Sequence, residues 1–228
     1  MNQKFIQAVL IDLDGTLVDS IPDLAAAANA MRVELGMAGL PLAHIAAFVG
    51  KGAENLVRRT LAGSLEGACD ERQVAPALAI FKRHYHQLNG TQTTVYPGVY
   101  EGLQAMQQQG LRLAVVTNKP LEFTVPLLKQ MGLDHYFQSV VGGDSTPHKK
   151  PHPAPLLHAC AALEVAPAQS FVVGDSANDA AAARAAGCGV LIVPYGYNEG
   201  QSCQSIESDG IVATLLDAAH WIVRHNCT

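Results

Sequence analysis

Short apolar runs recur along the chain and lead into Gly, Asp, Thr or Asn. They are "AVLID" (8–12), "RLAVVTN" (112–118), "SVVGGD" (139–144), "SFVVGD" (170–175) and "GVLIVPYG" (189–196). Near-continuous apolar runs of this length are typical of strands that are covered on both faces of a parallel sheet. The pattern therefore predicts five buried strands.

Helical patterns lie between these runs. We expect helices at about 99–109, 121–131, 154–163 and 177–186, with 211–223 closing the chain. Strands that alternate with helices of this length are typical of an α/β fold in which helices cover both faces of a parallel sheet. The predicted fold class is thus α/β, with a doubly wound parallel sheet.

Residues 18–90 break this rhythm. They contain no convincing strand, but "SIPDLAAAANAMRVEL" and "APALAIFKRHYHQL" have helical patterns, and turn signals lie at Gly36–Gly39 and Gly63–Gly67. The segment "DSIPD" has the features of a helix start, because a capping Ser or Asp is followed by a proline in the first turn. The sequence therefore predicts a helical insertion at 18–90, with the α/β core formed by 1–17 and 91–228.

Composition narrows the class of protein. The 228 residues are 49% hydrophobic, and 15 Lys and Arg against 20 Asp and Glu give a net charge of −5. One large domain, or a domain with an insertion, fits this length. The mild acidity argues against a nucleic-acid partner, although a small anionic ligand can still meet a local site of opposite charge.

The cysteines and apolar segments bear on location. Five cysteines without a C-x-x-C pair indicate neither a disulfide framework nor a zinc site, and they favour a reducing compartment. No apolar run reaches the length of a signal-peptide core or a membrane span. We expect a cytoplasmic protein without a membrane partner, and the sequence indicates no oligomeric state.

Polar residues with chemical potential follow the predicted strands. In a doubly wound sheet, ligands bind outside the carboxyl ends of the strands. Reading those ends in order gives Asp12 and Asp14, then Thr117 and Asn118, then Asp144, then Asp175 with Asp179 one helical turn later. The loop "KKPHPAP" adds Lys149 and Lys150. Continued strand alternation would point Asp12 and Asp14 to the same side, about 6.5 Å apart.

The charge of this group calls for a cation. Four ionised aspartates would carry −4 against +1 from a single lysine, and a phosphate dianion would add to the excess. Mg²⁺ prefers carboxylate oxygens and commonly bridges to substrate phosphate. With Mg²⁺ present, Asp12 could attack phosphorus and form an aspartyl-phosphate, while a protonated aspartate could act as general acid.

Each element also has an ordinary interpretation. A lone D-x-D at a strand end is often a turn, Thr117–Asn118 can cap the following helix, and Lys150 alone can be a solvated surface residue. The aspartates of "GDSAND" can simply favour a helix N-terminus. The order of all four elements, each at or just after a predicted strand, is what favours a shared site.

These motifs resemble those of the haloacid dehalogenase superfamily, in its magnesium-dependent phosphatase branch. "DLDGTLVD" is similar to the first family motif, "VVTNK" to the second, "KKPHPAP" to the third and "VGDSANDAAAARAAG" to the fourth. The similarity extends over nearly the whole chain. It implies a Rossmann-like core and an α-helical cap domain formed by the insertion.

The resemblance also implies roles for the catalytic residues. Asp12 would be the nucleophile, and Asp14 would be the general acid and then the general base. Thr117 and Lys150 would hold the phosphoryl oxygens. Lys149 is the neighbouring candidate for the third motif, but Lys150 directly precedes the proline as the family pattern prefers.

A metal site is implied in the same way. Asp12, the backbone carbonyl of Asp14, and Asp175 would bind Mg²⁺. Asp179 would support the metal through water or orient Lys150. Asp19 has no part in this chemistry and is expected at the helix start or the hinge of the insertion.

Within the superfamily, the chain is most similar to bacterial phosphatases that act on phosphoglycolate, so the expected partner is a small phosphorylated metabolite. Asn118 would help to bind the substrate. Gly50 and Lys51 of "VGKG" would contribute a backbone approach and a charge to a clamp for the substrate carboxylate. An ordinary helix-start turn is an equally good interpretation of "VGKG".

Other activities remain as alternatives. A phosphatase for another small sugar or amino-sugar phosphate is the nearest one, because related caps differ in specificity. Thr16 disfavours a phosphomutase, and Asp14 disfavours a metal-free dehalogenase. A receiver-like phosphoaspartate module has a similar set of Asp, Thr and Lys residues, but neither the insertion nor D-x-D-G-T is expected of it.

Overall fold

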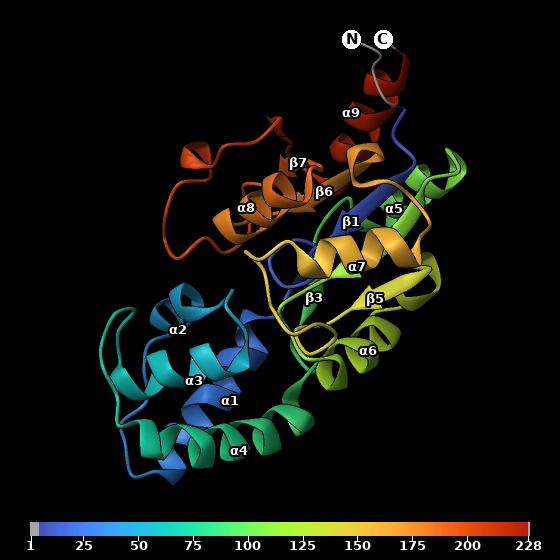
Figure 1. The fold of residues 1–228 in the computed structure, drawn as a ribbon. Helices are drawn as coiled ribbons and strands as arrows, with labels where there is room; N and C mark the ends of the chain where they lie inside the picture. Colours follow the sequence, from blue (N-terminus) through green and yellow to red (C-terminus); the bar gives the residue numbers. More distant parts are fainter. Residues whose placement is uncertain (1–4, 228) are drawn as a thin grey trace.

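A parallel sheet forms the centre of the computed structural model, which describes residues 5–227. Within these residues the sheet has six strands in the order β5-β4-β1-β6-β7-β8, and each neighbouring pair is parallel (Figure 1). Its strands are β1 (Ala8–Ile11), β4 (Arg112–Val116), β5 (Ser139–Val141), β6 (Ser170–Gly174), β7 (Gly189–Ile192) and β8 (Gly210–Ile211). The five predicted strands are thus present. Residues 1–4 and 228, at the limits of the predicted core, lie outside the described residues.

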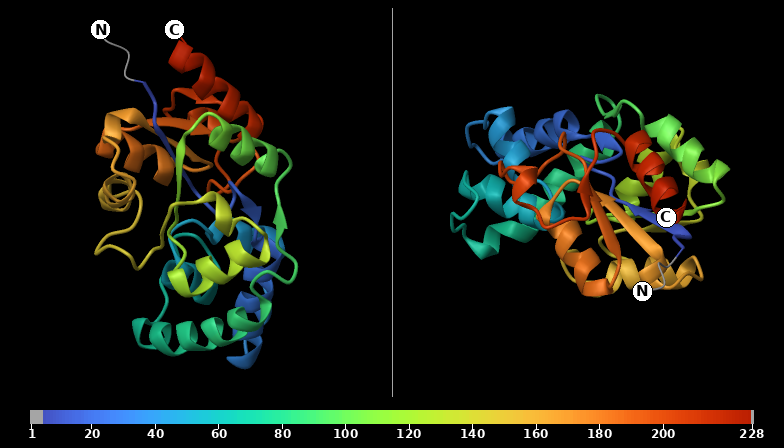
Figure 2. Two further views of the ribbon diagram at one scale, coloured as in Figure 1. Left: turned by 90° about the vertical axis from the view of Figure 1, so that its right-hand side faces the viewer. Right: turned by 90° about the horizontal axis from the view of Figure 1, so that it is seen from above.

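Helices cover both faces of the sheet, as the apolar runs require. In β1, Val9 and Ile11 pack into one hydrophobic cluster, and Ala8 and Leu10 pack into another on the opposite face. Figure 2 shows α9 and α5 on one side of the strands and α7 and α8 on the other. The helices of the core are α5 (Val99–Gln108), α6 (Leu121–Gln130), α7 (Ala154–Ala162), α8 (Ala177–Ala186) and α9 (Leu215–Cys227). The predicted doubly wound fold class is confirmed.

The C-terminal helix begins later than the predicted range of 211–223. Gly210 and Ile211 pair with Leu191 and Ile192 and form the edge strand β8, so Ile211 is not helical. The helix begins at Leu215, where the hydroxyl of Thr214 accepts a hydrogen bond from the Asp217 N–H at 3.1 Å. A two-residue strand is too short to leave a periodic signal, and only its partner strand defines it.

Between residues 20 and 90, all of them described, the chain forms four helices. These are α1 (Ile21–Glu34), α2 (Leu42–Phe48), α3 (Ala53–Ala62) and α4 (Glu71–Leu88), and we call residues 21–88 the helical unit. The unit has its own hydrophobic cluster, in which Phe123 of α6 is buried and against which Tyr197 of the core packs. In Figure 1 it lies beside the sheet, at the end where α6 begins. The predicted helical insertion is therefore present as a separate layer.

Two chain passages join the helical unit to the core, and they pair with each other. β2 (Val18–Asp19) and β3 (Thr94–Val95) form a two-stranded antiparallel ribbon, so the expectation of no strand within 18–90 is wrong at Val18–Asp19. The chain leaves the core at Val18–Asp19 and returns to it at Thr94–Val95, and the two segments are extended because they pair with each other.

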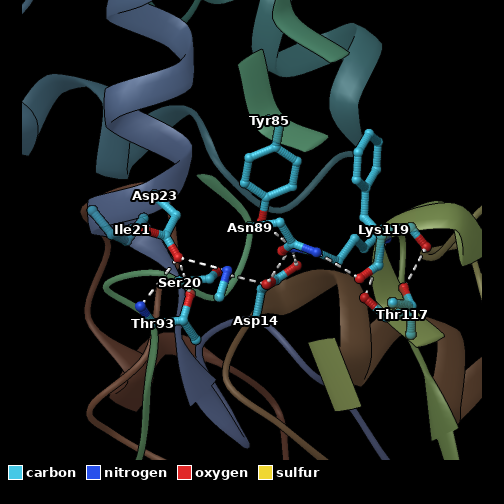
Figure 3. A network of polar contacts seen from close by, with 12 residues as sticks. Asp14, Ser20, Ile21, Asp23, Tyr85, Asn89, Thr93, Thr117 and Lys119 are labelled. Carbon is cyan, nitrogen blue, oxygen red and sulfur yellow. Dashed lines mark hydrogen bonds and ion pairs between the residues drawn. The ribbon is translucent and has the colours of Figure 1, made fainter. Parts of the chain in front are cut away.

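A buried carboxylate ties the two passages together. Asp23, in the first turn of α1, is fully buried and lies close to Thr93 in Figure 3. Its oxygens accept from the N–H groups of Gly90, Gln92 and Thr93 and from the hydroxyls of Thr91 and Thr93. A carboxylate that accepts this many hydrogen bonds is well compensated for its burial. Asp23 thus holds the start of the helical unit against its end.

Two findings bear on the remaining compositional expectations. The five cysteines, which all lie in the described part of the chain, are free thiols. Across residues 5–227, no helix combines the length and the apolar character that a membrane crossing requires.

Candidate active site

A cleft lies between the carboxyl ends of the central strands and the helical unit. It encloses about 640 Å³, including its open mouth. Both units contribute to its walls, and the apolar side chains come mainly from the helical unit. The lining residues are Asp12, Asp14, Leu24, Val49, Gly50, Gly52, Ala53, Leu56, Phe81, Tyr85, Thr117, Asn118, Lys119, Pro120, Phe123, Lys150, Asp175, Ser176, Asn178, Asp179 and Tyr197.

Lys150 joins two of the predicted aspartates at the floor of the cleft. Its Nζ lies 2.8 Å from Asp12 Oδ1 and 2.6 Å from Asp179 Oδ1, and it donates to the Val116 carbonyl at 2.7 Å. Lys150 is 5% exposed, whereas Lys149 is only partly buried and does not line the cleft. The geometry therefore favours Lys150 over Lys149 as the lysine of the site.

Asp179 is held by the start of α8. Its Oδ2 accepts from the N–H and the hydroxyl of Ser176, at 3.2 and 2.7 Å, which forms a capping box. A carboxylate in this position satisfies helix N–H groups that would otherwise be unpaired. The same residue thus caps α8 and supports Lys150.

Asp175 approaches the loop that follows β1. Thr16 Oγ1 donates to its Oδ1 at 3.1 Å, and the Tyr197 N–H donates to its Oδ2. Gly15 has a φ of +91°, and a Cβ there would lie 2.2 Å from Asp175 Oδ2. Glycine at position 15 is therefore needed for both the turn and the close approach of this carboxylate.

Three carboxylates form a group that fits a divalent cation. Asp12, Asp175 and Asp179 each present an oxygen, and these oxygens lie within 4.8 Å of one another. The side chain of Asp14 is not in this group. Hard carboxylate oxygens at this spacing are suited to Mg²⁺ or a similar cation. The donor set thus agrees with the metal site expected from the sequence, without identifying the ion.

The carboxylates of this group carry an excess of negative charge. Burial raises the pKa of Asp12 to about 7, against the opposing effect of Lys150, and the neighbouring Asp179 adds to the rise. Burial also raises the pKa of Asp175 well above its usual value, together with repulsion from Asp179 and Asp12. A cation bound here would relieve both effects, because it favours the charged carboxylates.

Asp14 takes different partners from Asp12. β1 ends at Ile11, before the D-x-D segment, and both aspartates line the cleft while Leu13 between them is buried in the core. Asp14 Oδ1 accepts from Ser20 Oγ at 2.6 Å and from Lys119 Nζ at 2.9 Å. Figure 3 shows Asp14 between Ser20, at the start of α1, and Lys119 of the core.

Lys119 is a further residue of the cleft, for which the sequence pattern predicts no role. It is 6% exposed, and its Nζ donates to the Tyr85 hydroxyl at 2.6 Å and lies 4.8 Å from the centre of that ring. Burial alone would lower the pKa of Lys119, but Asp14 and Tyr85 outweigh it and raise the pKa. The only available signal was its place in "VVTNK", directly after Thr117 and Asn118.

Thr117 and Asn118 both lie at the end of β4 and are buried. Thr117 Oγ1 accepts from the Lys119 N–H at 3.2 Å. Asn118 Nδ2 donates to the carbonyls of Gly50 and Lys150, and its Oδ1 accepts from the Lys150 N–H. The Asn118 side chain thus ties together three loops, and it does not cap α6, whose N-cap residue is Pro120.

The "VGKG" segment divides between the cleft and its outer rim. Gly50 and Gly52 line the cleft, with φ values of +123° and +86°. Lys51 is not among the lining residues. Its Nζ lies 2.8 Å from Glu199 Oε1, and Arg59 of α3 lies 2.7 Å from the same oxygen. Lys51 therefore contacts a core loop instead of facing the carboxylates.

Tyr197 connects Asp175 of the three-carboxylate group to the segment that enters α1. Its N–H binds Asp175, while its hydroxyl donates to Asp19 Oδ1 at 2.5 Å and accepts from the Ser20 N–H at 3.0 Å. Asp19 Oδ1 also accepts from the Ile21 N–H at 3.2 Å. Asp19 thus lies at the start of α1, away from the three-carboxylate group.

Comparisons with known proteins agree with the fold and the motifs. The profile of the haloacid dehalogenase-like hydrolases matches residues 6–187. The phosphoglycolate phosphatase of Nitrosospira multiformis is 52% identical over 217 residues, which cover 95% of this chain and 96% of that protein. The phosphoglycolate phosphatase of Thiobacillus denitrificans is 46% identical, with 96% of both chains covered.

A solved structure gives the same result. The crystal structure of a predicted phosphoglycolate phosphatase from Haemophilus somnus superposes with a TM-score of 0.89 at 35% identity, over 97% of this chain and 99% of that one. The resemblance based on the four motifs, and with it the expectation of an enzyme, is confirmed. The chain belongs to the haloacid dehalogenase-like hydrolases.

Proposed function

We propose that this hydrolase is a Mg²⁺-dependent phosphomonoesterase that converts 2-phosphoglycolate to glycolate and phosphate through an aspartyl-phosphate. The observation that supports it most directly is the position of Asp12. Its carboxylate ends the central strand, contacts Lys150 at 2.8 Å and faces a cleft that can admit a small ester. A nucleophile, a cation for the phosphoryl oxygens and a carboxylate group for a metal thus lie together.

Asp12 acts as the nucleophile in this proposal. One of its oxygens attacks phosphorus, and the bond from phosphorus to the ester oxygen breaks. Lys150, held by Asp179, stabilises the negative charge on the phosphoryl oxygens, with Thr117 and the backbone of Asn118 beside it. Asp179 therefore positions Lys150, in agreement with one of the two roles expected from the sequence.

Asp14 moves the protons. It protonates the departing ester oxygen of glycolate, and it then removes a proton from the water that attacks the phosphorus of the aspartyl-phosphate. Hydrolysis releases phosphate and restores the Asp12 carboxylate. Ser20 and Lys119 hold the Asp14 side chain at the boundary between the two units, apart from the three-carboxylate group.

Mg²⁺ would be held by Asp12, Asp175 and the Asp14 backbone carbonyl, with Asp179 beside it. When bound, it would neutralise charge on the phosphoryl oxygens and on the clustered carboxylates. The raised pKa values of Asp12 and Asp175 support this assignment, because a cation bound beside these carboxylates would stabilise their charged forms.

The helical unit is proposed as the cap of this site, with domain limits at 18–90 for the cap and 1–17 and 91–228 for the core. Support comes from its separate hydrophobic cluster, its ribbon of two passages and its share of the cleft wall. A cap that closes would exclude water from the aspartyl-phosphate and its attacking groups. Free thiols and a small polar substrate fit the proposed cytoplasmic location.

The substrate assignment draws on the similar proteins. Relatives that align over nearly their whole length, at 52% and 46% identity, are named phosphoglycolate phosphatases. Identity of this extent covers both the core and the helical unit, and caps set specificity in such enzymes. We therefore propose 2-phosphoglycolate in preference to a sugar or amino-sugar phosphate.

A panel of small phosphate esters tests the proposal. Phosphate release is measured with Mg²⁺ on 2-phosphoglycolate and on several sugar phosphates, with Asp12→Asn as the control. We expect 2-phosphoglycolate to have the highest kcat/KM and Asp12→Asn to lose at least about a thousandfold in kcat. Equal or better turnover of an unrelated sugar phosphate would contradict the substrate. A long-lived phosphoaspartate without turnover would instead support the receiver-like alternative.

A further inference from the structure

The geometry points to a second binding position in the cleft: we propose that Lys119 and Tyr85 together bind a carboxylate on the leaving group of the substrate. This inference rests on the proposed phosphatase function and specifies the chemistry of its substrate. It assigns to Lys119 the charge that the "VGKG" segment was expected to supply through Lys51, whose Nζ contacts Glu199 at the rim.

Positive charge in the cleft comes from two side chains. Among the described residues, Lys119 and Lys150 are the only basic ones that line it. Lys150 lies beside Asp12, Asp179 and the Val116 carbonyl, and the proposed function assigns it to the phosphoryl oxygens. A second anionic group on the substrate would need Lys119.

Lys119 retains bonding capacity for such a group. Its three contacts go to only two residues: Tyr85 Oη at 2.6 Å, Asp14 Oδ1 at 2.9 Å and Asp14 Oδ2 at 3.3 Å. The last is the longest, and Asp14 would remain bound through Oδ1 if it were lost. A carboxylate oxygen can therefore take this third position without breaking the ion pair with Asp14.

Tyr85 provides a second donor. Its hydroxyl accepts the hydrogen bond from Lys119, and within residues 5–227 its own hydrogen has no acceptor. The Tyr85 ring is 1% exposed and is held between Phe81 and Phe123, with ring centres 5.5 and 4.9 Å away. A rigid phenol beside an ammonium group can form a two-point contact with a carboxylate.

The distance from Asp14 matches a short leaving group. Asp14 is proposed to protonate the ester oxygen, and Lys119 Nζ lies 2.9 Å from Asp14 Oδ1. In 2-phosphoglycolate, one methylene separates the ester oxygen from the carboxylate carbon. An ester oxygen within hydrogen-bond reach of Asp14, at about 2.5–3.0 Å, thus brings the carboxylate within reach of Lys119.

The two donors come from different units. Lys119 follows β4 in the core, and Tyr85 lies on α4 in the helical unit, as Figure 3 shows from close by. Both are buried where they meet, so a carboxylate between them would lose most of its water and interact strongly. Binding of that carboxylate would also favour the arrangement in which the two units are together.

A pair of substrates separates carboxylate binding from catalysis. We compare kcat/KM for 2-phosphoglycolate with that for 2-hydroxyethyl phosphate, which has CH₂OH in place of the carboxylate. Lys119→Met should lower the ratio of these values about a hundredfold and Tyr85→Phe about tenfold, as expected for hydrogen bonds to a charged group. Any general effect through Asp14 lowers both values and leaves the ratio unchanged.

Matched variants control for lost charge and lost hydroxyl. Lys129→Met removes an exposed charge on α6, and Tyr100→Phe removes an exposed hydroxyl that binds the Met131 carbonyl. Both should retain the wild-type ratio. An unchanged ratio in Lys119→Met, with equal losses on both substrates, would overturn the proposal and leave Lys119 as a positioning residue for Asp14. If Lys119→Met does not fold, Lys119→Gln and Tyr85→Phe decide in the same way.

Ligand binding distinguishes this proposal from the proposed function. Calorimetry with Mg²⁺ compares 3-phosphonopropionate with propylphosphonate, neither of which can be hydrolysed and which differ by the carboxylate. Tighter binding of 3-phosphonopropionate, by about tenfold or more and lost in Lys119→Met, supports the carboxylate position even if 2-phosphoglycolate is not turned over. Equal binding of the two compounds overturns it even if 2-phosphoglycolate is the substrate.

Discussion

Two buried lysines hold the two aspartates of the D-x-D segment, and they differ in which parts of the molecule surround them. The partners of Lys150 all belong to the core: Asp12, Asp179 and the Val116 carbonyl. Lys119 lies between Asp14 of the core and Tyr85 of the helical unit, and Ser20 at the start of α1 completes the group.

The difference separates chemistry from recognition. The Lys150 group lies entirely within the core, at the carboxyl ends of its strands and the start of α8, so its contacts do not involve the helical unit. The Lys119 group is complete only when both units are in contact. In the proposed mechanism, phosphoryl transfer by the core can be common to many substrates, while the leaving group is bound by Lys119 of the core together with Tyr85 of the helical unit.

Lys150→Met provides the strongest test of this division. It removes the charge beside Asp12 and Asp179, so kcat should fall about a thousandfold for every substrate. The ratio of kcat/KM for 2-phosphoglycolate to that for 2-hydroxyethyl phosphate should remain unchanged, in contrast to Lys119→Met. Steady-state kinetics on both esters measure this. A large change in the ratio would show that Lys150 also reads the leaving group.

Asp23→Asn tests whether Asp23 holds the start of the helical unit against its end. The amide replaces one acceptor oxygen by a donor that faces the N–H and hydroxyl groups of residues 90–93, so the free energy of unfolding should fall by about 2–4 kcal/mol. Urea denaturation measures it. Asp70→Asn is the control, because Asp70 caps α4 at an exposed position where asparagine caps equally well. Equal effects of the two substitutions would remove the special role of Asp23.

Metal binding should depend on pH through the core group. The pKa of Asp12 is raised to about 7 and that of Asp175 well above the usual value, so the folded protein without metal holds protons that the unfolded chain releases near pH 4. The free energy of unfolding that these groups contribute therefore falls as the pH rises from about 4 through about 7. Mg²⁺ must displace the protons, so its stabilising effect should grow with pH.

Thermal unfolding with and without Mg²⁺ measures this effect. We expect Mg²⁺ to raise Tm by about 5–10 °C at about pH 8, with the ion at about a hundred times its Kd, and by less at about pH 6. Asp175→Asn should remove most of the difference. A shift of equal size at both pH values would show that these carboxylates do not bind the ion.

Glu199→Gln should have the smallest effect. Glu199 joins the core loop to Lys51 and Arg59 of the helical unit, but its side chain is 30% exposed. Partly exposed ion pairs contribute up to about 1 kcal/mol and are weakened by salt. Chemical denaturation at low and high salt should therefore show a small loss that vanishes at high salt. A large loss would make this contact, and not Asp23, the main link between the units.

The core group could be predicted because topology alone brings it together. Asp12, Thr117 and Asp175 follow β1, β4 and β6, which are neighbours in the sheet, and Lys150 lies in a loop at the same edge. Parallel strands present their carboxyl ends to one side, so the apolar runs and the residues that follow them are sufficient to predict this group.

The Lys119 group could not be predicted in this way. Lys119 is separated from Tyr85 by 34 residues and from Asp14 by 105, and its place directly after Thr117 and Asn118 does not indicate either partner. Asp23 has the same difficulty, because "SIPD" also describes an ordinary first turn. β8 was missed because two residues become a strand only when β7 lies beside them.

The α/β alternation, the helical insertion and the polar residues at the strand ends follow from the amino-acid sequence, because apolar periodicity and turn residues are local properties. Which lysine meets which aspartate, and that Tyr85 completes the second pair, depends on how distant segments pack together. Packing of the helical unit on the core buries these groups, and burial is what turns an ammonium, a phenol and a carboxylate into a specific contact.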